Sequence, residues 1–372
     1  MNARFAFNGQ AGEVLRRHVE RDSCDAKLSA KFRLYYRLRP WIPVPVRQWM
    51  QRSRNSSLES ANEWYLHHEF LRDWKTAVLA ESDQPLIHPW PDGNDISICL
   101  THDVETQAGH ALVDRLAALE ESMGFRSAWN FVPHKYRVDH GLLESLVARG
   151  HEIGIHGYNH DGRLFESRRT FQRRTPSINK ALSLYKSRGF RAPMVHRNLE
   201  WIQELDVEFD SSCFDVDPFQ AMPGGVGGVW PFIAGKVIEL PYTLPQDHTL
   251  FVSLGETCDR IWIDKFAHLK SMAGMALLIT HPDYLADERS LGIYRSFLDH
   301  LTTQSNVWRA LPSEIADWWR CRDRMELQTD SYNQIPAAYG QLPQITGEYS
   351  DRARVVTFGE LGKSQEAIFA TA

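Results

Sequence analysis

Three apolar segments of this 372-residue chain each run directly into ionisable side chains of the kinds that perform hydrolytic chemistry. The segments are residues 96–101, 152–155 and 275–280. The acidic and imidazole side chains that follow them are Asp103, Glu105, His156, His160 and His281. Parallel α/β folds place reactive groups at the carboxyl ends of their strands, so we expect the three ends to form one site.

His156 and His160 are four residues apart and follow a short apolar run, which predicts a metal site. If the chain turns helically after the strand, residues i and i+4 share a face and both rings can approach one ion. Two imidazoles and a carboxylate are a common set for a catalytic divalent metal such as Zn²⁺. The same set accepts Co²⁺, Mn²⁺ or Ni²⁺. The alternative is two unrelated histidines, because the chain contains 16.

Asp103 and Glu105 are the carboxylates expected to complete the site. Residues two apart in an extended strand project to the same side. One carboxylate can then bind the metal while the other removes a proton from water, whose pKa a bound metal lowers. Spacing alone leaves open which carboxylate has which role. The alternative is a pair of solvated acids at a strand end.

Two further residues follow from the same reasoning. His281 ends the downstream apolar segment and can protonate a leaving group, and Asp283 is close enough in sequence to orient it. Arg191, in a Gly-Phe-Arg-Ala-Pro run, can hold the base carboxylate ionised through a charge-assisted hydrogen bond. The alternatives are a histidine that caps a loop carbonyl and a surface arginine before a turn.

The elements that must position these residues begin at about residue 96. Short apolar segments alternate with amphipathic ones up to about residue 325, a pattern typical of repeated βα units. Seven or eight such strands favour an α/β barrel over a doubly wound sheet. We therefore expect a catalytic barrel over residues 96–325, an N-terminal arm and helix packed on it over residues 1–95, and an irregular tail over residues 326–372.

Segment 31–54 has seven basic residues, no acidic residue and many large apolar side chains. Its prolines, Pro40, Pro43 and Pro45, exclude one continuous helix. One interpretation is a basic, aromatic surface that contacts an anionic membrane peripherally. The other is an arm packed on the barrel with its arginine side chains in water. Composition alone favours the packed arm, because an interface-like composition is a weak signal.

The overall composition is that of an ordinary globular protein, with 43% apolar and 24% charged residues. A net charge of −5 gives no general attraction to nucleic acid. No apolar run approaches the ~18 residues of a membrane span, and no secretory signal is visible. Five scattered cysteines without a CxxC pair argue against a disulfide framework. These features predict a cytoplasmic protein, with peripheral membrane association left open.

In this order, the segments resemble the five motifs of the NodB-homology polysaccharide deacetylases, metal-dependent carbohydrate esterases on a distorted (β/α) barrel. The resemblance covers about residues 96–317. Thr-His-Asp-Val-Glu at 101–105 stands where the family usually has Thr-Phe-Asp-Asp-Gly, and resembles the variant with a residue between two acids. His-Gly-Tyr-Asn-His at 156–160 matches His-Ser/Thr-x-x-His except at Gly157. Residues 191–193 match Arg-x-Pro, and residues 277–281 match Leu-x-Ile-x-His.

The resemblance implies that Asp103 is the catalytic base and that Zn²⁺ or another divalent cation binds Glu105, His156 and His160. The departure of the first motif from the usual pattern leaves open whether Asp103 itself binds the metal. By the same resemblance Arg191 tunes the base.

The remaining assignments concern the second half of the site. Phe-Asp-Ser-Ser at 209–212 resembles the fourth motif, so Asp210 is taken as the acid that supports the catalytic His281, with Asp215 and Asp217 as rivals. Three further residues are interpreted as cleft residues that help to select substrate: Asp247, His248 and Asp283.

The implied activity is metal-dependent removal of an N-acetyl group from an amino sugar, in a polysaccharide or a glycan-biosynthesis intermediate. Because no secretory signal is visible, a lipid-linked or nucleotide-linked sugar is favoured over an extracellular polymer. The alternatives are hydrolysis of another non-peptide C–N bond on the same fold, or a non-catalytic glycan-binding relative.

Overall fold

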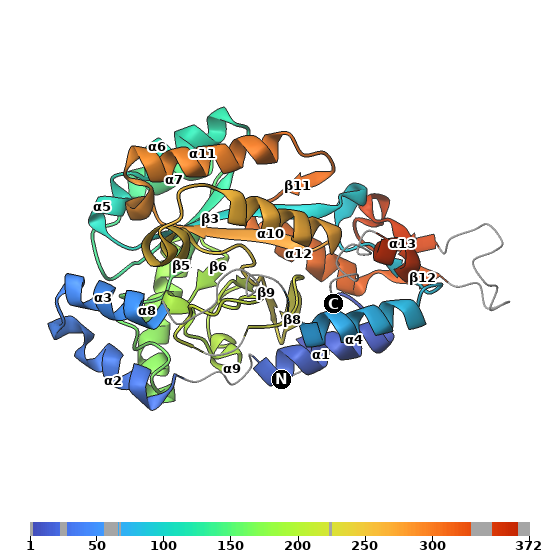
Figure 1. Cartoon of the computed structure of the whole chain (residues 1–372), viewed down its shortest axis with the longest axis horizontal. Coiled ribbons are helices and arrows are strands. Elements are labelled where there is room, and N and C mark those ends of the chain that lie inside the picture. The colour runs from blue at the N-terminus through green and yellow to red at the C-terminus, as the bar shows by residue number, and fades with distance from the viewer. Residues whose placement is uncertain are drawn as a thin grey trace.

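The computed structural model describes residues 3–22, 28–55, 66, 68–222, 225–328 and 344–363 (Figure 1). Parts of the expected N-terminal arm and helix (residues 1–95) and much of the expected tail (residues 326–372) lie outside these ranges. In the described part the chain forms one large curved sheet with helices around it, and additional elements from both ends of the chain pack against it.

The large sheet has ten strands in the described chain. The order along the sheet is β1-β8-β9-β7-β6-β5-β4-β3-β10, with β11 beside the start of β3. All pairs from β9 to β10 are parallel, whereas β8 and β1 are added antiparallel at one end. The strands are β1 (Ala3–Arg4), β3 (Ile96–Val104), β4 (Ser127–Phe131), β5 (Glu152–His156), β6 (Gly189–Arg191), β7 (Phe209–Asp210), β8 (Phe232–Ala234), β9 (Val237–Glu239), β10 (Met275–Thr280) and β11 (Val307–Arg309).

Helices connect the parallel strands, as the βα pattern predicts. Figure 1 shows α5, α6, α7 and α11 gathered on one side of β3. The helices between and after the strands are α5 (Gln107–His110), α6 (Val113–Ser122), α7 (His140–Ala148), α8 (Arg168–Tyr185), α9 (Leu199–Ile202), α10 (Arg260–Ser271), α11 (Glu288–Thr302) and α12 (Pro312–Arg324). Short helical turns follow β6 (Pro193–Val195) and β10 (Pro282–Leu285), and a π-helix (His248–Leu254) precedes α10.

Strands β3 and β10 are buried along their whole lengths, which explains why their sequences are almost continuously apolar. Their register sets Thr280 beside His102, so that Asp103 and His281 follow next to each other at the same edge. The same logic sets Asp103 beside Asn130 of β4 and His156 beside Arg191 of β6. Strand register therefore gathers distant polar residues at one end of the sheet.

The alternation of side chains along β3 separates two polar groups. Thr101 and Asp103 face the interior of the sheet, where both contact Arg191. His102 faces the helices instead, and its Nε2 lies 2.7 Å from Oε1 of Glu120, with both side chains fully buried. His102 is therefore part of the structural core behind the site and does not line it.

The two ends of the parallel sheet approach each other. The backbone N–H groups of Thr243 and Leu244 both donate to the carbonyl of Leu277 on β10, at 3.1 Å each. The chain just after β9 thus lies against β10 without a regular strand pair. This arrangement is an irregular, incompletely paired α/β barrel.

Further elements from the two ends of the chain pack around the barrel. These are α1 (Gly9–Asp22), α2 (Ala30–Leu38), a 3₁₀ turn (Arg39–Trp41), α3 (Val44–Asn55), α4 (His68–Ala80), β2 (Pro85–Ile87), β12 (Glu326–Gln328), β13 (Gln344–Thr346), β14 (Val355–Thr357) and α13 (Phe358–Lys363). The prolines of segment 31–54 break it into two helices, as expected. The end of the chain, expected to be irregular, contributes β14, which pairs with β2. In the described residues no helix is long and apolar enough to cross a membrane.

Glu152 at the start of β5 gives a testable effect of pH on stability. Its Oε2 accepts a hydrogen bond from the Ser313 N–H (3.0 Å), while its buried Oε1 has no partner, and burial raises its pKa from 4.5 to about 7. Because the pKa is higher in the folded state, its contribution to stability is complete below pH 4.5 and is lost as pH rises through about 7.

We expect Glu152→Gln to remove this loss, which amounts to at most about 3 kcal/mol of unfolding free energy. The measurement is urea unfolding of both proteins at several pH values across this range. The exposed Glu144→Gln on α7 is the matched control. Parallel stability curves for wild type and Glu152→Gln would contradict the assignment.

Candidate metal centre and active site

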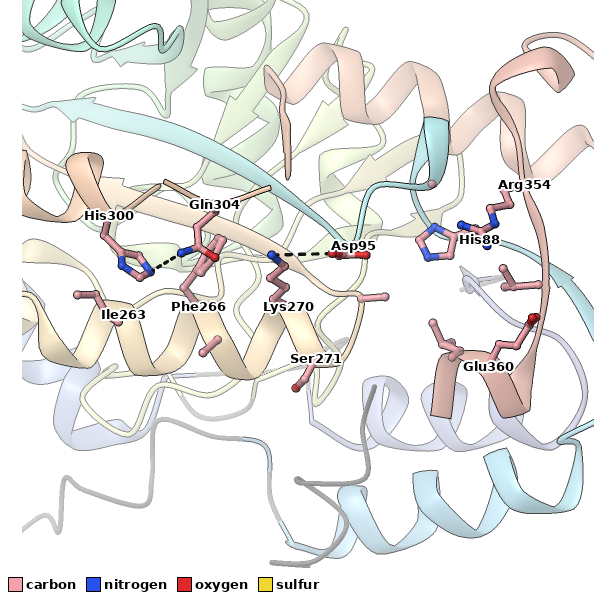
Figure 2. A pocket seen from close by; sticks show the side chains of 15 residues that line it. His88, Asp95, Ile263, Phe266, Lys270, Ser271, His300, Gln304, Arg354 and Glu360 are labelled. Carbon is pink, nitrogen blue, oxygen red and sulfur yellow. Dashed lines mark hydrogen bonds and ion pairs between the residues drawn. The ribbon is translucent and has the colours of Figure 1, made fainter. Parts of the chain in front are cut away.

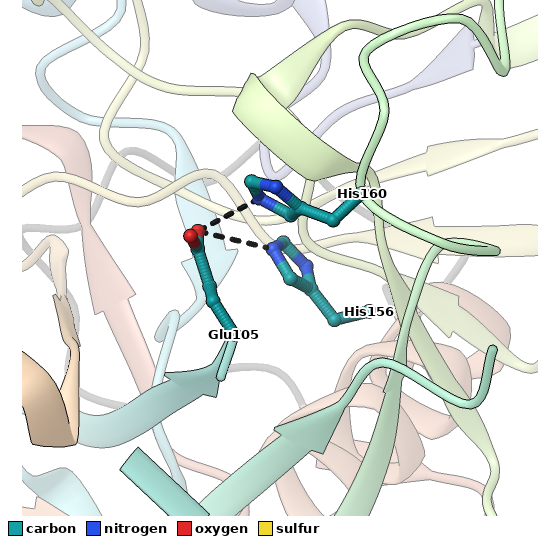
Figure 3. A group of neighbouring side chains, drawn as sticks. All are labelled: Glu105, His156 and His160. Atoms are coloured by element: carbon teal, nitrogen blue, oxygen red, sulfur yellow. Dashed lines mark ion pairs between the residues drawn. The ribbon is translucent and has the colours of Figure 1, made fainter. Parts of the chain in front are cut away.

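Glu105, His156 and His160 converge at the carboxyl end of the sheet (Figure 3). One ligand atom from each lies within 4.8 Å of the other two. Oε1 of Glu105 is 2.8 Å from Nε2 of His160 and 3.7 Å from Nε2 of His156. The three residues predicted as metal ligands are therefore brought together from β3 and the end of β5.

The two histidines do not converge through a helical turn, so that part of the prediction is wrong. β5 ends at His156, and the next residues form an irregular turn in which Gly157 has φ +66° and His160 has φ +59°. The ring centroids lie 5.1 Å apart. A Cβ atom on Gly157 would lie 2.3 Å from Cδ of Pro193, so the glycine that departs from the family motif is required by this turn.

The donor atoms fit a divalent cation. The Nδ1–H of His156 donates to the carbonyl of Arg191 at 3.2 Å, which leaves Nε2 free to bind a metal. Nε2 of His156 and Nε2 of His160 are buried and lack a hydrogen bond of good geometry, although both face Glu105. The histidine side chains are 2% and 5% exposed and that of Glu105 is 25% exposed, so the group opens to solvent on the carboxylate side.

The charge state of the carboxylate also suits a metal. Burial raises the pKa of Glu105, but the neighbouring His160 and the hydrogen bonds from the three site histidines outweigh it and hold the pKa well below its ordinary value. Burial lowers the pKa of His160. An ionised carboxylate beside imidazole nitrogens is the set that Zn²⁺ and related ions bind.

Asp103 lies beside this group and is held by two neighbours. Its Oδ1 accepts hydrogen bonds from NH1 of Arg191 and Nδ2 of Asn130, each at 2.9 Å. Its Oδ2 is 3.7 Å from Nε2 of His156. Burial raises the pKa of Asp103, but the charge of Arg191 and those of the site histidines prevail and set it at about 2. Asp103 is thus ionised, with one oxygen anchored and the other directed toward the metal group.

His281 also lies close to Glu105, and Asp247 holds its ring in place. Nε2 of His281 is 3.6 Å from Oε1 of Glu105. Oδ1 of Asp247 is 2.7 Å from Nδ1 of His281, and Oδ2 accepts the His281 backbone N–H at 2.6 Å. Burial lowers the pKa of His281, but the Asp247 carboxylate outweighs it and raises the pKa well above its ordinary value. His281 therefore presents a protonated Nε2 to the site.

The structure places the other predicted acids elsewhere. Asp247 is fully buried and both its oxygens are occupied, so it holds His281 and is not a substrate-selecting residue. Asp283, expected to orient His281, accepts from the Thr106 hydroxyl at 2.5 Å. His248 is half-buried, with its ring centroid 5.1 Å from that of Tyr284, which in turn packs on His281.

None of the acids named for the fourth motif contacts His281. Asp210 is buried below Arg191, where Ser212 donates to it at 2.6 Å and Glu239 is its carboxyl partner. Burial raises the pKa of both acids of this pair. Asp215 forms a buried ion pair with Lys265 (2.7 Å), and Asp217 accepts from the Tyr242 hydroxyl (2.7 Å).

Two residues of the site escaped sequence reasoning. Asn130 lies mid-sequence in a strand with no motif around it, and Glu239 ends a short apolar strand. Gly154 could have indicated a polar neighbour at this position, because a Cβ atom on Gly154 would lie 1.8 Å from Oδ1 of Asn130. A glycine inside a buried strand indicates close approach of a neighbouring group.

A pocket of about 640 Å³ lies at the opposite end of the strands (Figure 2). It is bordered by Asp95, Lys270 and Arg354, with Lys270 3.8 Å from the Asp95 carboxylate. Asp95 directly precedes β3 and Ala273 lies two residues before β10, so the pocket is at the amino ends of these strands. None of the predicted site residues lines it, and the carboxyl ends carry the chemistry in barrels of this kind.

The contact between Asp247 and His281 predicts a kinetic effect. Asp247→Asn should lower kcat roughly 100-fold while the metal content stays unchanged, because the ring loses its charged partner but no ligand is removed. Steady-state kinetics and metal analysis measure the two quantities. Asp283→Asn is the matched control and should change kcat little. Similar losses in both variants would contradict the assignment of Asp247.

No family model matches the sequence, and no curated protein matches it. The chain is similar in structure to a putative polysaccharide deacetylase from Mycobacterium smegmatis, with a TM-score of 0.54, 19% identity, and coverage of 66% of this chain and 97% of that one. Weaker similarities are to Puue allantoinase (TM-score 0.49, 16% identity, 63% and 93% coverage) and a probable polysaccharide deacetylase from Pseudomonas aeruginosa PAO1 (0.48, 17%, 63% and 94%). The expected NodB-homology fold, a distorted (β/α) barrel, is confirmed.

Proposed function

We propose that this chain with the NodB-homology fold is a metal-dependent hydrolase that removes an N-acetyl group from an amino sugar of a polysaccharide or glycan intermediate. One observation carries the proposal. A group able to bind a divalent cation lies 3.7 Å from the anchored carboxylate of Asp103, through His156, and 3.6 Å from the anchored ring of His281, through Glu105. A base and an acid beside a metal group are what amide hydrolysis needs.

Glu105, His156 and His160 would hold the cation, with Zn²⁺ as the first choice and Co²⁺, Mn²⁺ or Ni²⁺ as alternatives. When bound, a divalent cation supplies Lewis-acid polarisation of a carbonyl group and acidifies water. The carbonyl of Arg191 keeps the His156 ring in the orientation that directs Nε2 into the site. Arg191 therefore contacts a ligand through its backbone and the base through its side chain.

Asp103 accepts a proton from water as the water oxygen forms a bond to the acyl carbon. Its low pKa keeps Asp103 in the ionised form, which can accept this proton. His281 donates the proton on Nε2 to the nitrogen of the breaking C–N bond. The products are acetate and a free sugar amine, and Asp247 stabilises the imidazolium that supplies the proton.

The choice of substrate rests on the fold and on the motif resemblance. The similar Mycobacterium smegmatis structure bears the name putative polysaccharide deacetylase. An acetamido sugar has the neutral carbonyl and the amine leaving group that this set of residues can serve.

The test measures acetate and free amine released from an N-acetylglucosamine oligomer by the full chain loaded with Zn²⁺. Equimolar acetate and amine, lost on chelation and restored by Zn²⁺, Co²⁺, Mn²⁺ or Ni²⁺, is the expected result. Formation of ammonia or of a ring-opened product from another amide, in place of acetate, would favour the other C–N hydrolase. Stoichiometric sugar binding with no hydrolysis by metal-loaded protein would favour a binding protein.

A further inference from the structure

Exposed apolar side chains are concentrated in α2, α3 and the turn between them. In the described chain, ten large hydrophobic residues are exposed, and six of them lie between residues 34 and 50. They are Leu34 (57%), Leu38 (45%), Trp41 (77%), Val46 (43%), Trp49 (69%) and Met50 (40%). Single exposed apolar residues are ordinary, whereas a cluster of this kind marks an interaction surface.

The cluster has helical order. Leu34 and Leu38 are four residues apart on α2, and Val46, Trp49 and Met50 have the i, i+3, i+4 spacing of one face of α3. Exposed Lys31, Arg33 and Arg37 lie on α2 among them. We call these six apolar and three basic residues the arm surface.

The other side of the same segment is fixed to the barrel. The Tyr36 ring packs edge-on against His196, with centroids 4.8 Å apart. Both terminal nitrogens of Arg54 donate to backbone carbonyls, those of Phe219 (2.9 Å) and Gln220 (3.0 Å). Burial raises the pKa of Tyr36 to about 12. Because these contacts fix one side of segment 31–54 to the barrel, the arm surface on its other side faces outward.

The arm lies close to the candidate active site. Tyr36 contacts Gly162 and His196, which follow His160 and the Arg191 motif respectively. NH1 of Arg39 is 3.8 Å from Sδ of Met194. The Arg39 charge also contributes to lowering the pKa of Lys135 and of His248, behind burial as the main cause. Figure 1 shows α2 and α3 at one end of the molecule, apart from α1, α4 and α13.

We propose that the arm surface docks on an anionic lipid bilayer and so holds the mouth of the metal site at the membrane surface. Tryptophan and leucine beside lysine and arginine are the side chains that enter the boundary between headgroups and acyl chains. Segment 31–54 contains seven basic and no acidic residues, which complements anionic headgroups and disfavours a neutral apolar partner. Both interpretations of segment 31–54 then hold, because one side of it packs on the barrel and the other side contacts the membrane. If the proposed hydrolysis is also correct, the acetylated sugar is presented to the enzyme at a lipid surface.

The test is sedimentation of the full chain with vesicles of phosphatidylcholine alone and of phosphatidylcholine mixed with phosphatidylglycerol. Binding is expected to the anionic vesicles and to weaken as salt is added. Trp41→Ala combined with Trp49→Ala should lower the partition coefficient roughly tenfold or more. Leu79→Ala combined with Leu184→Ala is the matched control, because both leucines are exposed elsewhere (63% and 58%), and it should bind like wild type.

A second variant separates a binding effect from a folding effect. Lys31→Gln with Arg33→Gln should weaken binding to anionic vesicles roughly fivefold per charge removed, with an unchanged melting temperature. Absence of binding at low salt, or equal binding of wild type and the tryptophan variant, would overturn the proposal. It would also be overturned if wild type is a dimer that the tryptophan variant cannot form, since the surface would then join two copies. His156→Ala should bind vesicles like wild type, so the outcome is independent of hydrolysis.

Discussion

Replacement of His156 by alanine is expected to abolish stoichiometric metal binding and, with it, hydrolysis. His156 supplies one of three donor atoms that lie within 4.8 Å of one another, and its Nδ1 is already committed to the Arg191 carbonyl. Loss of an outer-shell partner alone typically costs 10–100-fold in metal affinity, so loss of a ligand should exceed ~100-fold. Activity should fall by at least the same factor, because the remaining acid and base lack an acidified water.

Metal analysis after dialysis and titration with Zn²⁺ measure this effect directly. The exposed His140→Ala on α7 is the matched control and should retain one equivalent of metal. If His156→Ala retains one equivalent with unchanged affinity, the Glu105 group is not the metal centre, and the proposed mechanism fails with it.

Asp103→Asn should lower kcat by roughly 10³-fold while leaving the metal bound, within the range that general acid–base catalysis contributes. Asparagine keeps an oxygen that can accept from Arg191 and Asn130, so the surrounding contacts survive. The substitution removes the negative charge, so the side chain can no longer accept a proton from water. The motif alone left open whether Asp103 is the base or a ligand, and this variant separates the two roles.

Kinetics together with metal content decide the outcome. Glu105→Gln is the contrasting variant, because it should lose the metal as well as the activity. If Asp103→Asn loses the metal, Asp103 is a metal ligand. If its kcat is nearly unchanged, Asp103 is not the catalytic base.

The sequence by itself determined the strands of the barrel and most of the residues at their carboxyl ends. Buried parallel strands are apolar along their whole length, so an abrupt change to Asp, Glu or His marks where each strand ends. The convergence of Glu105, His156 and His160 followed from this local signal and from the rule that such ends share one edge. The proline-broken arm was also readable, because proline acts within its own turn.

Tertiary structure alone decided which carboxylate pairs with the catalytic histidine. Asp247 reaches His281 across 34 positions, because the chain near residues 243–244 hydrogen-bonds to β10. The sequence indicated Asp210 through its motif resemblance and Asp283 through its closeness along the chain, because a sequence records no distance across the sheet. The same reason hid Asn130, which strand register alone sets beside Asp103, and hid His196 as the residue against which the arm packs. Whether a side chain meets a partner depends on strand register and packing, and these are properties of the assembled sheet.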